Sequence, residues 1–219
     1  NAAMATIVGG ESVKTFSILT VPFYKQAIFL GTPAFLIVTV LVTTGTSNAV
    51  NLTDGMDGLA AGCMVLCSFV FMILAFLSGD PVRASSLLFP YIPNTAELAI
   101  LCGAMVGACL GFLWYNGFPA QVFMGDTGSL ALGGLIGYVA IVIRQELMLF
   151  IVGGIFVIEA CSVMIQIDSN KLFGKRPFRV APIHHHFHLG GWQETQVVMR
   201  FWLLAAIFAA VALATIKLR

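Results

Sequence analysis

The sequence predicts an all-α, polytopic membrane protein: a bundle of about six transmembrane helices. Hydrophobic residues make up 59% of the 219 residues and charged residues only 10%, whereas a soluble domain has about 45–50% and about 25%. Six segments have the roughly 20 mostly apolar residues that a membrane-spanning helix needs. The apolar runs lack the alternation of a membrane β-strand, and lipid cannot satisfy the backbone groups of an open strand. We therefore expect helical spans.

The six spans follow one another with short connections. They are predicted over the ranges 28–46, 58–79, 96–115, 127–144, 146–167 and 198–216. The loops 47–57, 116–126 and 168–197 then lie on one membrane face, and the remaining connections lie on the other. Lys and Arg are dense in the loop 168–197, which favours the cytoplasm for the first face. Residues 1–27 then form a non-cytoplasmic segment, and residues 28–219 form the transmembrane catalytic domain.

Net charge and cysteine usage exclude several function classes. A net charge of +1 gives no reason to expect nucleic acid as a partner. The five cysteines lie inside apolar runs without zinc-site spacing, so we interpret them as packing residues.

The first polar motif occupies the loop 47–57. Asn48, Asn51, Asp54 and Asp57 recur every three residues, which repeats polar groups along one side of a helical or turn-like segment. Carboxylate and amide oxygens suit Mg²⁺, a metal that also takes substrate phosphates as ligands. The structural alternative is a helix end, a turn and an N-cap, which would explain one aspartate rather than four polar groups in register.

The second motif occupies the loop before the fourth predicted span. Asp126 precedes the helix, with Thr127 and Ser129 in its first turn. A helix N-terminus favours phosphate, and a carboxylate there would hold the neutralising metal. An N-cap role for Asp126 is the alternative. Phe123 is predicted either to stack on a base or to anchor the loop at the membrane interface.

The third motif holds all four histidines of the chain. His184, His185, His186 and His188 fall within five residues, near Lys175, Arg176 and Arg179. Consecutive histidines on a helix cannot all ligate one ion. Arginine forks and histidine donors favour a phosphate site, with a solvated charge run as the alternative. The three motifs together indicate Mg²⁺-dependent phosphoryl transfer to or from a lipid phosphate at a membrane surface.

Three ungapped strings resemble a known enzyme family. They are Asn48-Ala-Val-Asn-Leu-Thr-Asp-Gly-Met-Asp-Gly-Leu-Ala60, Phe118-Pro-Ala-Gln-Val-Phe-Met-Gly-Asp-Thr-Gly-Ser129 and Ala181-Pro-Ile-His-His-His-Phe187. The family is the phospho-N-acetylmuramoyl-pentapeptide transferases, a branch of the polyprenyl-phosphate N-acetylhexosamine-1-phosphate transferases. The resemblance runs from about Thr20 to the C-terminus. It implies the last six helices of a ten-helix fold in the bacterial inner membrane, with the active site facing the cytoplasm.

The resemblance also implies a reaction and a set of site residues. Undecaprenyl phosphate would attack UDP-MurNAc-pentapeptide, giving lipid I and UMP in peptidoglycan synthesis. Asp126, with Asn51, would hold Mg²⁺, and Asp54, His184 and His185 would complete the catalytic group. Substrate-binding residues would be Asn48, Gly55, Met56, Asp57, Asn116, Phe123, Arg179 and His186. Membrane lipid is an expected partner, nucleic acid is not, and the family allows a homodimer.

Two departures from the family pattern matter. The family's Asp-Asp pair and four preceding helices are absent from these 219 residues, so we expect a C-terminal portion that is weak or inactive alone. His188 stands where the family usually has Glu, which puts a metal or base role at that position in doubt.

Two competing functions remain. A GlcNAc-1-phosphate transferase of the same superfamily would use another UDP-sugar. A metal transporter would place ionisable groups near the bilayer midplane, where this chain has only Glu159. Glu159 either pairs with a neighbouring helix or lines a cavity, and the sequence assigns it no role.

Overall fold

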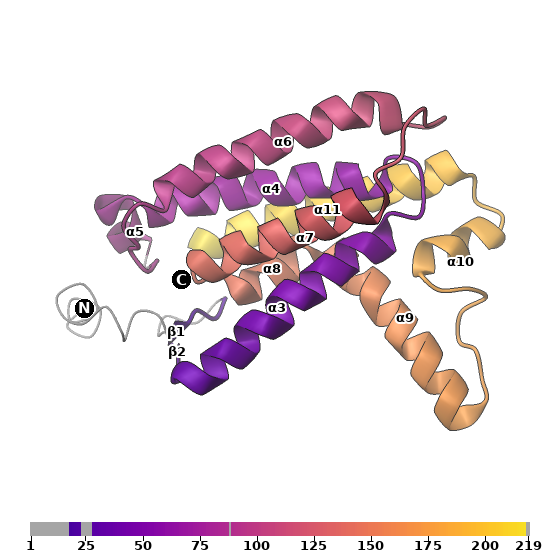
Figure 1. Cartoon of the computed structure of the whole chain (residues 1–219), viewed down its shortest axis with the longest axis horizontal. Coiled ribbons are helices and arrows are strands. Elements are labelled where there is room, and N and C mark those ends of the chain that lie inside the picture. The colour runs from indigo at the N-terminus through magenta and orange to yellow at the C-terminus, as the bar shows by residue number, and fades with distance from the viewer. Residues whose placement is uncertain (1–17, 23–27, 88, 218–219) are drawn as a thin grey trace.

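The computed structural model describes residues 18–22, 28–87 and 89–217, and most of the predicted segment 1–27 lies outside them. Two short strands, β1 (Ile18–Leu19) and β2 (Ile28–Phe29), pair antiparallel. The rest is helical: α3 (Thr32–Thr53), α4 (Leu59–Ser78), α5 (Pro81–Ser86), α6 (Ala96–Asn116), α7 (Gly125–Val142), α8 (Glu146–Val152), α9 (Gly154–Phe173), α10 (Ile183–Leu189) and α11 (Glu194–Lys217). Figure 1 shows the five longest helices other than α9 running roughly alongside one another.

The predicted class of a multi-pass helical membrane protein is confirmed. Within the described residues, five helices are long and apolar enough to cross a bilayer, and α8 with α9 makes a sixth span if the bent pair is counted as one. The bend measures 86° and replaces the single helix predicted over 146–167. Gly153 and Gly154 stand at the break, where a glycine pair commonly kinks a helix. A Cβ on Gly154 would lie 2.7 Å from the ring of Phe208 on α11.

The first span starts and ends later than the predicted range 28–46. Helix α3 runs to Thr53, so Asn48 and Asn51 lie on its last two turns rather than in a loop. The helix tolerates these polar residues because their hydroxyls donate to backbone carbonyls four residues earlier. The Thr46 hydroxyl donates to Val42 at 2.8 Å, and the Thr53 hydroxyl donates to Ala49 at 2.8 Å. The helix therefore carries its polar motif out of the apolar region.

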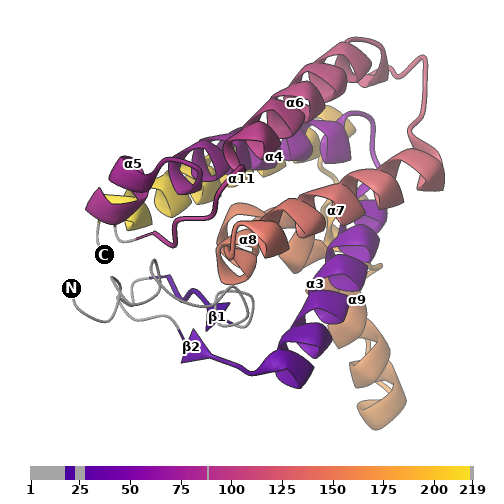
Figure 2. The same cartoon turned by 60° about the vertical axis from the view of Figure 1, so that its left-hand side comes forward.

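Two helix pairs build the bundle. Helix α4 packs mainly against α6, and α3 packs mainly against α7, with α11 beside α4 (Figure 2). The α3–α7 contact is close because Gly133 lacks a side chain. A Cβ there would lie 2.7 Å from the Cα atom of Ser47. Helix α4 is the most buried of the spans and provides much of the core.

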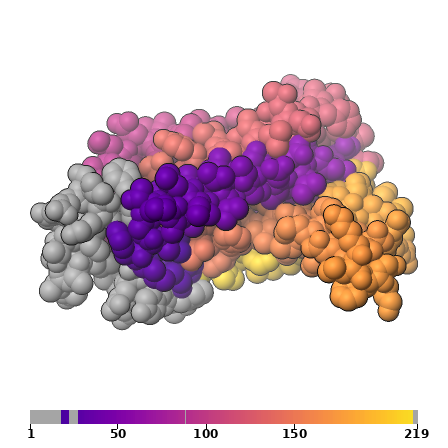
Figure 3. Space-filling model, turned by 60° about the horizontal axis from the view of Figure 1, so that its bottom comes forward, coloured from indigo at the N-terminus to yellow at the C-terminus, as the bar shows by residue number. Residues whose placement is uncertain are grey.

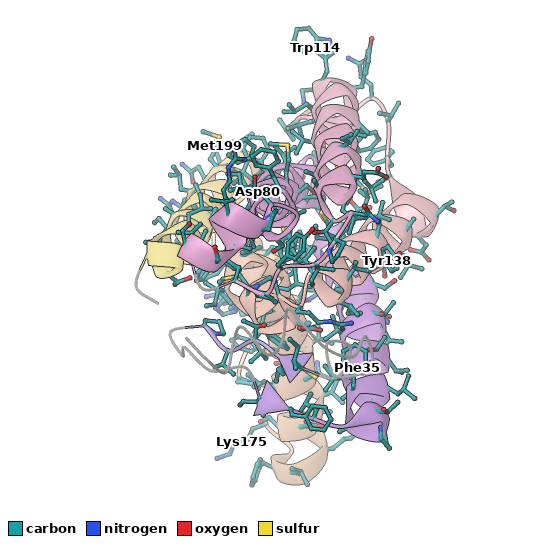
Figure 4. All side chains as sticks on the ribbon, turned by 90° about the vertical axis from the view of Figure 1, so that its left-hand side faces the viewer. Phe35, Asp80, Trp114, Tyr138, Lys175 and Met199 are labelled. Carbon is teal, nitrogen blue, oxygen red and sulfur yellow. The ribbon has the colours of Figure 1, made fainter. Side chains whose placement is uncertain are left out.

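The bundle brings the three polar motifs to one end. The α3–α4 turn, the α6–α7 loop and α10 all lie at the end opposite α5 (Figure 1). Helix α9 leaves the bundle obliquely toward the same end. In Figure 4, Trp114 extends from α6 on one side of the molecule, while Lys175 lies beyond the end of α9 on the other side.

Candidate active site

The first two motifs meet where α3 ends and α7 begins. The amide nitrogen of Asn51 donates to a carboxylate oxygen of Asp126 at 2.8 Å and contacts the Ser129 hydroxyl at 2.9 Å. Because the amide nitrogen makes these contacts, only the amide oxygen of Asn51 is left to face a metal. Asn51 therefore orients the carboxylate of Asp126.

Asp54 lies beside Asp126 at the end of α3. Partial burial raises the pKa of Asp54, the N–H of Gly125 donates to its carboxylate and lowers the pKa, and the charge of Asp126 raises it again. Two neighbouring carboxylates are hard oxygen donors that a divalent cation would hold together. Within the described residues, no group of three or more His, Cys, Asp or Glu could hold a metal ion. In general, Mg²⁺ binds through one or two carboxylates and completes its shell with water and substrate phosphate.

Two histidines of α10 lie against the same turn. A Cβ on Gly55 would collide with Nε2 of His184 and would lie 3.4 Å from Nε2 of His185. The two imidazole rings are 4.2 Å apart between centroids. Partial burial lowers the pKa of His185, and the neighbouring His184 lowers it further. Glycine at position 55 thus lets both rings approach the backbone beside Asp54.

Asp57 and Asn116 join the two loops. A carboxylate oxygen of Asp57 accepts the Ala120 N–H at 2.9 Å. The Asn116 amide accepts the Gly58 N–H at 3.1 Å and donates to the Val122 carbonyl at 2.8 Å. Asn116 is buried, so its side chain mainly holds the α6–α7 loop against the α3–α4 turn.

Helix α11 supports this turn from the opposite side. A carboxylate oxygen of Glu194 accepts the Asp57 N–H at 3.1 Å. The indole N–H of Trp202 donates to the Gly58 carbonyl at 3.3 Å. Sequence reasoning missed both residues because neither belongs to a polar motif. The acidic start of the last span was the available signal for Glu194.

Glu159, for which the sequence predicted no role, lies against His184. Its carboxylate lies 3.1 Å from Nδ1 of His184, and both side chains are completely buried. An ionisable residue in the middle of a predicted span indicates a functional or paired position, but His184 could not be identified as the partner of Glu159 without the fold.

The remaining predicted binding residues have other contacts. Met56 is buried, and the Asn48 amide donates to the Thr44 carbonyl at 2.8 Å. Phe123 is 77% exposed, so its ring is free to stack on a planar ligand. Arg179 and His186 bond within the third motif. Arg179 donates from Nη1 to the Leu189 carbonyl at 2.6 Å, and His186 accepts the backbone N–H of Arg179 at 3.1 Å.

An apolar pocket lies against α3. It is lined by α3, α7, α8 and α9, including Val42, Ala49, Val50, Leu149, Phe156 and Ala160. Figure 3 shows the face on which α3 lies beside the α8–α9 segment. On α3 the lining ends with Ala49 and Val50, and Asn51, which contacts Asp126, is the next residue of the helix.

Comparison with known proteins agrees with the resemblance. The chain is 54% identical over 206 residues to a phospho-N-acetylmuramoyl-pentapeptide-transferase of Methylacidiphilum infernorum, covering 92% of the chain and 55% of that relative. It is 53% identical over 204 residues to the enzyme of the same name from Thermodesulfovibrio yellowstonii, covering 93% and 56%. The chain thus spans about half the length of these curated relatives.

The sequence model of glycosyl transferase family 4 matches residues 1–144, which include the first two motifs. The predicted resemblance is therefore confirmed, and the chain belongs to glycosyl transferase family 4.

Proposed function

We propose that this chain carries most of the active site of a phosphoglycosyl transferase that moves phospho-MurNAc-pentapeptide from UDP-MurNAc-pentapeptide to undecaprenyl phosphate. The supporting observation is the contact between Asn51 and Asp126, beside Asp54, on a helix that also lines an apolar pocket. An apolar wall next to paired carboxylates suits a substrate with a hydrocarbon chain and a phosphate. The names of the relatives supply the choice of sugar.

The reaction exchanges one phosphate bond for another. An oxygen of the lipid phosphate bonds to the phosphorus attached to the sugar, and the bond from that phosphorus to UMP breaks. The products are lipid I, with its diphosphate, and UMP. Phosphoryl transfer depends chiefly on positioning and on stabilising negative charge. Gly55, Asp57 and Phe123 would lie beside the uridine, with the ring of Phe123 stacked on the base, and the buried Met56 and Asn116 would support these loops from inside.

Magnesium would be held by Asp126, with Asn51 orienting that carboxylate and Asp54 beside it. When bound, Mg²⁺ would neutralise the charge of the diphosphate. His184 and His185 lie against the turn at Gly55 and would face the diphosphate or the sugar. We place this site on the cytoplasmic face of the bacterial inner membrane, since its UDP-linked donor is a soluble nucleotide.

The test is a transfer assay with the intact protein in membranes. We expect lipid-linked product and UMP from UDP-MurNAc-pentapeptide, and a loss of at least about 10³-fold in Asp126→Ala if the metal is lost. Glu97→Ala is the matched control, since Glu97 is exposed in the first turn of α6, and α6 begins at the other end of the bundle (Figure 1). Preference for UDP-GlcNAc would move the assignment to the other branch of the superfamily. Metal flux that survives Asp126→Ala, without transfer, would favour a transporter.

A further inference from the structure

Glu159 and His184 form a buried pair between α9 and α10. Carboxylate oxygen Oε2 of Glu159 lies 3.1 Å from Nδ1 of His184, and neither side chain is exposed to solvent. Within the described part of the chain, this is the only ion pair recorded for Glu159. This contact falls short of hydrogen-bond geometry, and within those residues neither carboxylate oxygen of Glu159 and neither ring nitrogen of His184 has a hydrogen-bond partner. The pair is thus isolated from the rest of the polar residues.

A buried carboxylate is costly unless a donor or a positive charge compensates for it. The neighbouring groups compensate only weakly. Ser162, one turn along α9, bonds to the backbone carbonyl of Glu159 and not to its carboxylate. Cys63 of α4 lies near the carboxylate, and a thiol is a weak donor. His184 is therefore the group that accounts for an acid at this depth.

The two nitrogens of the His184 ring face different surroundings. Nδ1 faces Glu159, whereas the Nε2 edge faces the backbone of Gly55, next to Asp54. A carboxylate accepts hydrogen bonds, so it favours the tautomer with the proton on Nδ1. Nε2 is then left with a lone pair directed at the turn. If Nε2 takes up a proton, the carboxylate balances the resulting charge, as acids behind catalytic histidines do.

We propose that Glu159 is a positioning residue that keeps the proton of His184 on Nδ1 and presents Nε2 to the catalytic turn. This inference rests on the proposed transferase function. Glu159 touches no substrate in this arrangement and acts only through the imidazole.

The first test is a set of variants in the intact protein, assayed in membranes. Replacing an acid that supports an active-site ligand typically costs about 10–100-fold in activity, so we expect a fall of that size in kcat for Glu159→Gln. The KM for the UDP-sugar should change little, and Glu159→Asp should recover part of the loss. Ser162→Ala is the matched control, because it removes a buried hydrogen bond from the same helix and leaves the pair intact.

A double-variant cycle separates positioning from folding. Glu159→Gln should cause almost no further loss on a His184→Ala background, because residues that act as a unit are not additive. Full additivity of the two losses would contradict the proposal, and so would wild-type kcat in Glu159→Gln.

The second test does not depend on activity. Nitrogen-15 NMR of histidine-labelled intact protein, with His184→Gln used to assign the signal by difference, reports the tautomer of His184. We expect a proton on Nδ1 in the wild type and a mixture in Glu159→Gln. A wild-type lone pair on Nδ1 would overturn the proposal even if transfer is measured. Absence of transfer in the wild type would count against the proposed function and leave the tautomer result to be judged separately.

Discussion

At the scale of single residues, the site depends on the absence of one side chain. Gly55 lies where a Cβ would meet Nε2 of His184 and would lie 2.9 Å from Cε1 of the same ring. We predict that Gly55→Ala displaces the rings and lowers kcat by about a hundredfold, the cost of a shift of about 1 Å in a catalytic group. The measurement is steady-state transfer in membranes. Gly107→Ala on α6, where a Cβ would meet open space, should remain close to wild type.

Asp54 offers a second prediction, on stability. Burial and the charge of Asp126 raise its pKa, so its ionised form is disfavoured in the folded protein. Above that raised pKa, ionised Asp54 subtracts from stability, and this penalty disappears as the pH falls through it. Asp54→Asn should therefore raise the thermal unfolding midpoint at neutral pH without magnesium, by a few degrees at most, while transfer is lost. An unchanged midpoint in a melting scan would show that the two carboxylates do not oppose one another.

At the scale of elements, the first turn of α11 holds the α3–α4 turn in place. Glu194 does so by accepting a backbone N–H from Asp57, for which an amide oxygen would serve as well. We predict that Glu194→Gln is nearly silent. Glu194→Ala should lose one hydrogen bond of about 1 kcal/mol, equivalent to about fivefold in the KM for the UDP-sugar. Equal effects of both changes in initial-rate measurements would show that the charge matters, and not the hydrogen bond.

At the scale of the whole molecule, the bend between α8 and α9 creates the wall of the apolar pocket. Ala160 lines this pocket, whereas Ile158 lies outside it and is partly exposed. We predict that Ala160→Trp raises the KM for undecaprenyl phosphate by about tenfold. This rise corresponds to displacing about two CH₂ groups of the lipid chain from the pocket, at about 0.8 kcal/mol each.

Ile158→Trp is the control for that prediction, since it adds the same side chain to another side of α9. Transfer assays with a short-chain polyprenyl phosphate should show a smaller difference between Ala160→Trp and wild type. An equal rise in KM for both lipids would place the hydrocarbon chain elsewhere.

The sequence predicted the overall arrangement of the helices but not the exact helix ends or the buried contacts. Apolar runs of spanning length predicted the helical class and the clustering of polar loops at one end, because the parity of the spans determines which loops share a face. The sequence did not reveal that α3 extends through Thr53, since backbone carbonyls satisfy its polar side chains. Nor could the pair of Glu159 and His184 be predicted, because a bend of 86° determines where α9 directs that acid.

The bare backbone at Gly55 also has a consequence for inhibitors. A compound that binds this part of the turn contacts main-chain atoms, and a substitution does not change the identity of those atoms. Any side chain introduced there to block the compound would first collide with His184. Under the proposed function, resistance at this position would come at the expense of transfer, which makes the Gly55 backbone a durable point of attachment for an inhibitor.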